Sequence, residues 1–196
     1  MPSPVPETIM SLKLDLYFTR ILAQFYPTAR LTKDAKETLN DFVIQFLYQF
    51  VEYMVTVMMH KQTKTLSHRD AQTATQLLFE GLLRRYAISE GVRAITKYAG
   101  FMATSRRRKG RVRDNEKAGV ILPPSRIRRY LVHTVPTFKY HIRISKEAVL
   151  YVTAVTDYIL YEIIEHAGKD KSVITSQDIK HVFDNDREIS KTVCRL

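Results

Sequence analysis

The chain has 196 residues, and its 31 Lys and Arg exceed its 20 Asp and Glu, so the formal net charge is +11. An excess of this size favours an anionic partner, nucleic acid before a membrane surface. Hydrophobic residues make up 45% of the chain, which excludes a protein disordered throughout. The single cysteine, Cys194, excludes a disulfide framework and a multi-cysteine metal site.

The first elements are a short helix over about residues 12–25, closed by Pro27, and a long helix from Thr32 to about His60. Thr32 is the candidate N-cap, because a hydroxyl accepts a hydrogen bond from the first free N–H groups of a helix. A helix of 29 residues is about 43 Å long. Two short helices cannot cover its broad apolar face, so a second module must pack against it.

The segment from Phe42 to Met59 is nearly apolar enough for a membrane span, and 18 residues are about the minimum length for one. Its polar residues recur at steps of four, three and four: Gln45, Gln49, Glu52 and Thr56. At about 100° per residue they fall within an arc of about 60°. A single narrow polar stripe is typical of a helix packed over most of its circumference, so we predict a core helix and no membrane partner.

A second start signal follows at Ser67 and Asp70, with the spacing hydroxyl-x-x-Asp. The hydroxyl can cap the new helix, and the carboxylate favours its positive N-terminal end. The β-prone pair Thr65-Leu66 just before this cap predicts a short strand. A further amphipathic helix is expected over residues 82–99.

Residues 100–117 contain seven basic and two acidic residues and almost no apolar residue after Met102, which predicts a basic linker. We interpret its cationic run as a nuclear-localisation patch, a phosphate clamp or a solvated tether. The run consists of Arg106, Arg107, Arg108, Lys109, Arg111 and Arg113.

The remaining residues repeat the plan of the first 99. A short helix over residues 125–131 is opened by two prolines, and a long helix runs from Ser145 to about Ala167. Val173-Ile174 predicts a short strand, and Thr175 and Asp178 repeat the hydroxyl-x-x-Asp start. We therefore divide the chain into a first module (1–99), a linker (100–117) and a second module (118–196).

Short helix, long helix, short helix in interlocked pairs is the order of the histone fold, and the sequence resembles that family over about 160 residues. Residues 13–99 resemble core histone 2B, most specifically at 66–74 and 87–98. Residues 117–189 resemble core histone 2A, most specifically at 118–127 and 162–168 and again at 185–189. Two core histones in one chain resemble the histone doublets of giant DNA viruses of the marseillevirus type.

The resemblance implies an all-α fold in which two histone folds form an intramolecular histone 2B–2A-like pseudo-heterodimer. The side chains expected to face each other across its core are Phe42, Phe46, Phe50, Met54 and Val57 from one long helix and Val149, Val152, Val155 and Ile159 from the other.

The function that the resemblance implies is packaging of a viral genome. The chain is expected to bind double-stranded DNA largely without sequence specificity. It is expected to form nucleosome-like particles with a histone 4–histone 3-like doublet and a second copy of itself. The expected location is the virion and the viral factory or host nucleus. No catalytic or metal-ligand pattern stands out, so we expect no cofactor, no metal and no enzyme activity.

The family contacts phosphates through arginines and helix N-termini, whose N–H groups and positive dipole end attract anions. The matching positions here, together with the linker cations named above, are Arg30, Thr32, Lys33, Lys64, Thr65 and Arg69 in the first module and Arg126, Arg128, Arg129, Arg143 and Lys171 in the second. Any one of them could be simple solvated surface charge, but their recurrence at the same loops of both modules favours DNA binding.

An acidic face matches the family's docking patch for basic peptides: Glu90, Asp157, Glu162, Glu165, Asp186 and Glu188. Leu82 and Arg187 replace two acids of that patch, so the alternative is a solvated polar face. Residues 1–10 contain no Lys or Arg, whereas the family has a long basic N-terminal tail. Histone-fold pairs also occur in transcription regulators and coactivator subunits, which is the alternative function.

Overall fold

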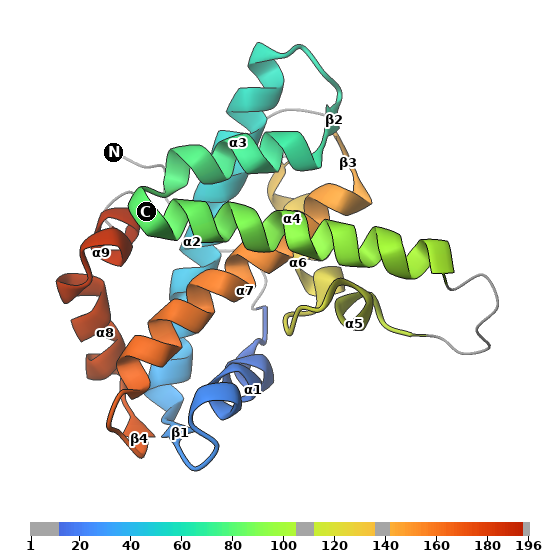
Figure 1. Cartoon of the computed structure of the whole chain (residues 1–196). Helices are drawn as coiled ribbons and strands as arrows, with labels where there is room; N and C mark the ends of the chain where they lie inside the picture. The colour runs from blue at the N-terminus through green and yellow to red at the C-terminus, as the bar shows by residue number, and fades with distance from the viewer. Residues whose placement is uncertain (1–11, 105–111, 136–141, 194–196) are drawn as a thin grey trace.

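Two long helices cross at the centre of the molecule, α2 (Lys33–His60) and α7 (Lys146–Gly168), as Figure 1 shows. This computed structural model describes residues 12–104, 112–135 and 142–193. Both long helices begin where the hydroxyl caps predicted. The Ala35 N–H donates to Thr32 Oγ1 at 3.4 Å, and the Ala148 N–H donates to Ser145 Oγ at 3.1 Å.

Further helices flank these two. In the first half they are α1 (Asp15–Phe25), α3 (His68–Leu78) and α4 (Gly81–Thr104), and in the second half α5 (Asp114–Ala118), α6 (Pro124–Thr134), α8 (Ser176–Asn185) and α9 (Arg187–Val193). The sequence did not predict α5 and α9; the others lie where helices were expected. The hydroxyl-x-x-Asp signals at Ser67 and Thr175 are the N-caps of α3 and α8.

Part of the predicted basic linker, residues 100–117, is helical. Helix α4 continues to Thr104, and α5 occupies Asp114–Ala118. The reason is a contact between the two helices: the Lys117 ammonium of α5 lies 5.9 Å from the ring centroids of both Tyr98 and Phe101 on α4. Such cation–π contacts hold α5 against the last turns of α4.

Two short parallel strand pairs tie the halves together. Strand β1 (Arg30–Leu31) pairs with β4 (Val173–Ile174), and β2 (Thr65–Leu66) pairs with β3 (Arg143–Ile144). Strands β2 and β4 are the two that the sequence predicted. In each pair one strand precedes the long helix of one half, and the other strand follows the long helix of the other half. Each end of the molecule is therefore built from both halves.

One core is shared by both halves. Phe42, Phe46 and Phe50 form a stack along α2, with ring centroids 5.9 and 5.7 Å apart. Phe42 also stacks on Phe183 of α8 at 5.2 Å, so the stack extends into the second half. Met54 and the four predicted α7 residues, Val149, Val152, Val155 and Ile159, are buried in the same cluster.

Val57 is the exception among the predicted core residues, because it is half-buried. The buried stripe of α2 advances by four residues from Phe46 through Phe50 and Met54 to Met58, so Met58 takes the inward position.

Helix α2 is long and apolar enough to span a membrane by length and composition alone, with a mean hydropathy of 1.4 over its most apolar window. More than half of that window, 56%, is buried inside the protein. The residues of the predicted polar stripe are exposed or half-buried. This pattern is that of the core helix which the sequence predicted.

Candidate nucleic-acid interface

The first candidate contact surface is the β2–β3 end, which we define as Lys64, Thr65, Arg69 and Arg143. Thr65 and Arg143 are opposite each other in the strand pair, and the Arg143 N–H donates to the Lys64 carbonyl oxygen at 3.0 Å. All four side chains are exposed. Within the described parts of the chain, none of the three cations has an acidic partner within 4 Å.

A buried aspartate fixes the backbone at this end. Asp70, only 2% exposed, accepts hydrogen bonds from the Ser67 N–H at 2.8 Å and the Ser67 hydroxyl at 2.7 Å, and pairs with Lys61 at 2.8 Å. Burial favours a higher pKa for Asp70, but the hydrogen bonds from Lys61 and Ser67 outweigh it, so the pKa is lowered. The carboxylate therefore stays charged and holds the start of α3 in place.

The second surface is the β1–β4 end, which we define as Arg30, Thr32, Lys33 and Lys171. The Arg30 N–H donates to the Ser172 carbonyl at 3.0 Å, and the Thr32 N–H to the Ile174 carbonyl at 3.0 Å. Arg30, Lys33 and Lys171 are exposed, and Thr32 is half-buried because it caps α2. The strand pair thus brings together basic residues that are far apart in the sequence, at the start of one half and near the end of the other.

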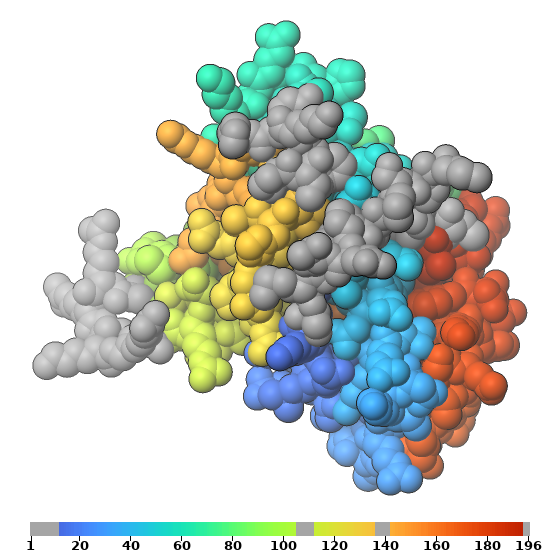
Figure 2. Space-filling view, turned by 180° about the vertical axis from the view of Figure 1, so that it is seen from behind, coloured from blue at the N-terminus to red at the C-terminus, as the bar shows by residue number. Residues whose placement is uncertain are grey.

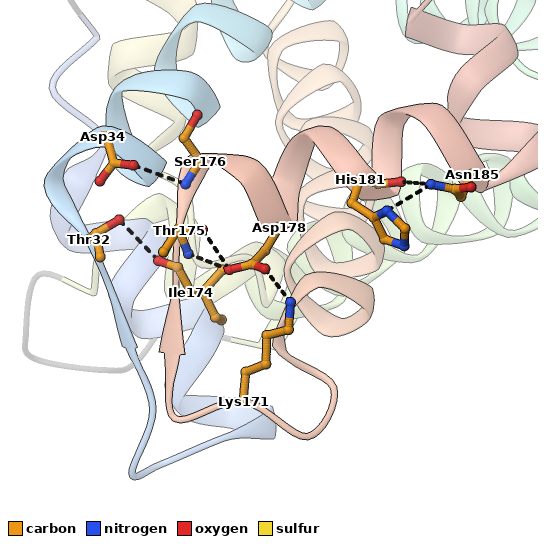
Figure 3. Close-up of polar contacts among 9 residues, drawn as sticks. All are labelled: Thr32, Asp34, Lys171, Ile174, Thr175, Ser176, Asp178, His181 and Asn185. Carbon is orange, nitrogen blue, oxygen red and sulfur yellow. Dashed lines mark hydrogen bonds and ion pairs between the residues drawn. The ribbon is translucent and has the colours of Figure 1, made fainter.

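At the β1–β4 end, carboxylates accept hydrogen bonds from several polar groups, as Figure 3 shows. Asp34 of α2 accepts a hydrogen bond from the Ser176 N–H at the start of α8, at 3.1 Å. Asp178 accepts from the Thr175 N–H and hydroxyl at 2.7 and 2.8 Å and forms an ion pair with Lys171. The hydrogen bond from Lys171 is the main reason why the pKa of Asp178 is lowered to about 2.

The third surface lies where α1 meets α6, side by side on the face seen in Figure 2. Arg126, one of the predicted DNA contacts, is half-buried. Its guanidinium donates to the carbonyls of Leu12, at 3.1 Å, and Lys13, and lies 5.2 Å from the ring centroid of Tyr17. Arg126 therefore joins the starts of the two short helices.

Three other predicted cations near this contact are exposed: Arg113 at the start of α5, and Arg128 and Arg129 on α6. The remaining linker cations fall outside the described residues, namely Arg106, Arg107, Arg108, Lys109 and Arg111. Their assignment to DNA stays a prediction.

The acidic face is smaller than predicted, because Asp157 is buried at 5% exposure. Its carboxylate accepts hydrogen bonds from the N–H groups of Ile121, at 2.7 Å, and Leu122, at 3.2 Å. Burial raises the pKa of Asp157 to about 6, in spite of these two hydrogen bonds. Asp157 therefore anchors the segment before α6 and is not a docking residue.

Two more of the predicted acids stabilise helix starts. Glu188 accepts hydrogen bonds from the Leu82 and Leu83 N–H groups at 3.0 and 2.7 Å, at the beginning of α4. Asp186 accepts from the N–H groups of Glu188 and Ile189 at the beginning of α9. Both carboxylates thus already accept hydrogen bonds from backbone N–H groups, which leaves fewer acceptor positions for a docked basic peptide.

The other three acids border a cavity of about 340 Å³ between α1, α4 and α7. Glu90 pairs with Arg93 at 2.7 Å, Glu162 is half-buried and Glu165 is exposed. The structure thus brings together part of the predicted acidic face, with one of its charges already paired.

Known proteins share this arrangement of helices, although no family model matches the chain. The chain is 25% identical to "Histone H2B.v1" of Dictyostelium discoideum over 191 residues, which cover 89% of this chain and 82% of that protein. The crystal structure of the histone from Methanopyrus kandleri matches 91% of this chain and 97% of that chain, with a TM-score of 0.55 and 16% sequence identity. The chain is a histone-fold protein.

A match over 91% of the chain necessarily includes both halves, so the paired arrangement also occurs within one solved histone chain. The predicted all-α class with two histone folds is confirmed.

Three cations were not predicted from the sequence, Arg20, Lys117 and Lys146, and they gather with Arg113 and Arg128 around a second cavity. Little in the sequence marks these cations as contact residues: Arg20 lies within a short helix, and Lys146 directly follows the Ser145 cap.

Proposed function

We propose that this histone-fold chain is a DNA-packaging histone doublet that binds double-stranded DNA largely without sequence specificity. The observation that carries the proposal is the pair of parallel strand contacts, since each brings basic side chains of both halves to one end of the molecule. The α1–α6 contact supplies a third basic surface on the same core. Three basic surfaces on one core suit a curved phosphate backbone.

The contacts proposed here involve phosphates and not bases. Lys64, Arg69 and Arg143 form one contact, Arg30 and Lys33 belong to another, and Arg128 and Arg129 supply the third. The starts of α2, α3, α7 and α8 are close to these side chains, and helix starts favour negative charge. A surface of this type reads the shape and charge of DNA.

The proposed assembly contains a histone 4–histone 3-like doublet and a second copy of this chain, in a nucleosome-like particle that compacts a viral genome. Support comes from the histone name of the relative and from the resemblance of the second half to core histone 2A. The proposed location is the virion and the viral factory or host nucleus.

A histone-fold transcription regulator is the second candidate. The observation that favours it is the structural use of Asp157, Asp186 and Glu188, because an acidic docking face was our sequence argument for packaging. The likeness to a histone over 89% of the chain favours packaging.

The binding experiment that separates the two candidates compares duplexes of unrelated sequence over a range of salt concentrations. For packaging we expect dissociation constants that agree within about threefold, and a log–log salt slope of about −0.9 for each phosphate contacted. A preference of about 1,000-fold or more for one sequence would identify a regulator instead.

A further inference from the structure

A second cavity of about 850 Å³ lies between α1, α5, α6 and α7, on the side of α6 where the helix begins. Six cationic side chains from these four helices and their caps line it: Arg20, Arg113, Lys117, Arg126, Arg128 and Lys146. Among the described residues that line this cavity, Asp114 is the one acid. The formal charge of the lining is therefore +5.

Ion pairs within the cavity lining hold its two lysine side chains in place. Asp114 pairs with both Lys117 and Lys146, each at 3.2 Å, and Lys146 also lies 4.7 Å from the ring centroid of Tyr98. Burial favours a higher pKa for Asp114, but the two lysines outweigh it and lower the pKa. The Asp114 carboxylate is therefore charged at neutral pH, and it balances only one of the two lysine side chains.

The arginines of the lining divide into two kinds. Arg20 and Arg126 lie 5.5 and 5.2 Å from the ring centroid of Tyr17, which holds both guanidinium groups at the wall. Arg113 and Arg128 are exposed, and neither has an acidic partner within 4 Å among the described residues. Two cations are thus available to a ligand at the rim of the cavity.

The start of α6 adds a helix dipole to this charge. Pro123, Pro124 and Ser125 line the cavity, and the helix that begins there is 11 residues long. The positive end of a helix favours an anion, and here it borders the same space as the six cations. The charge and the dipole therefore select the same kind of ligand.

The size of the cavity favours a small ligand. Sites for small molecules typically have volumes of about 300–1,000 Å³, whereas a DNA duplex contacts a histone-type surface by single phosphates along its outside. We propose that the cavity binds a small polyphosphate anion, a compound with two or more adjacent phosphate groups. This inference goes beyond DNA packaging, and a DNA backbone phosphate is the other source of the same chemistry.

The test is calorimetric titration of the full chain with sodium tripolyphosphate. We expect saturable binding at one site. The double variant R113A/R128A should lower the affinity about tenfold or more, because each arginine can donate two parallel hydrogen bonds to a phosphate. The matched control is Arg129→Ala, since Arg129 is exposed on the same helix but does not line the cavity; its affinity for tripolyphosphate should change by less than about twofold. Thermal unfolding verifies that each variant folds.

Two results would overturn the inference. Absence of saturable binding, or an equal loss in R113A/R128A and Arg129→Ala, would mean that tripolyphosphate meets only diffuse surface charge. A double variant that loses duplex DNA affinity, in a chain that does not bind tripolyphosphate, would assign the arginines to the DNA backbone. Duplex binding is measured separately, so failure of the packaging proposal with intact tripolyphosphate binding leaves the cavity proposal standing.

Discussion

The β1–β4 end and the β2–β3 end have the same backbone plan, a parallel strand pair beside two helix starts, yet their carboxylates are arranged differently. At the β1–β4 end, Asp34 of one half binds the first N–H of α8 in the other half, and Lys171 is paired with Asp178. At the β2–β3 end, Glu147 takes the place that Asp34 has in α2, and it is exposed.

We therefore infer that the two ends use the same arrangement of strands and helix starts for different purposes, stability and DNA binding. The β1–β4 end has a carboxylate bridge between the halves, so more of its polar groups serve stability. The β2–β3 end has its main carboxylate, Asp70, buried below the surface, and Lys64 and Arg143 remain exposed. We expect the β2–β3 end to contribute more to DNA binding.

The largest effect should come from the core that both ends share. Phe46→Ala removes a ring in contact with Phe42, Phe50 and Phe79, and such truncations cost about 3–5 kcal/mol. We expect one cooperative urea transition and a parallel loss of amide-exchange protection at both ends. Val132→Ala, on an exposed apolar residue of α6, should change the free energy of unfolding by less than about 0.5 kcal/mol. Separate unfolding of the two ends would contradict a shared core.

The two capping aspartates should differ in their contribution to stability. Asp70→Ala removes a buried carboxylate and leaves the half-buried Ser67 N–H and Lys61 without their acceptor, so it should lower the free energy of unfolding by about 2–3 kcal/mol. Asp178→Ala acts at a less buried site and should cost about 1 kcal/mol. Chemical denaturation of both variants measures the difference, and equal losses would show that burial does not distinguish the two ends.

DNA affinity should also be more sensitive to substitution at the β2–β3 end. The double variant K64A/R143A should lower duplex affinity about tenfold and make the salt slope shallower by about 2, because each removed cation neutralises about one phosphate. The matched variant R30A/K171A should lower affinity about threefold, because Lys171 must leave Asp178 to reach a phosphate. Fluorescence anisotropy at several salt concentrations gives both quantities. A larger loss in R30A/K171A would reverse our assignment.

A smaller effect concerns Asp157, which belongs to neither end. Its pKa in the folded chain is about 6, above the usual 3.8, so the folded state binds more protons than the unfolded state between these values. Its contribution to stability should therefore improve by about 1 kcal/mol as the pH falls from about 7 to about 5. Asp157→Asn should lack this dependence, which denaturation of both proteins at the two pH values measures. An identical pH dependence in both would contradict the raised pKa.

The helix starts could be predicted from sequence because their signals are local. Thr32, Ser67, Ser145 and Thr175 each combine a hydroxyl with a following amphipathic run, and the structure has an N-cap at all four. The pairing of the strands could not be derived from the residues alone, since a strand of two residues carries no register information. The family resemblance supplied the interlocked arrangement.

The site residues were harder to predict, because exposure depends on distant partners. Arg126 looked like a surface cation, but the carbonyls of Leu12 and Lys13 lie beside it after folding. Asp157 lies in a helix that is apolar on nearly every side, and a carboxylate in such a helix requires buried hydrogen-bond donors. The donors, the N–H groups of Ile121 and Leu122, come from a different part of the chain, before α6.

The most direct test of the packaging account is nuclease digestion of DNA reconstituted with this protein and a histone 4–histone 3-like doublet at about 150 mM salt. The account predicts a protected fragment of discrete length that is absent when either protein is left out. A continuous smear of fragments with both proteins present would contradict it, and would leave a basic histone-fold protein that binds DNA without wrapping it.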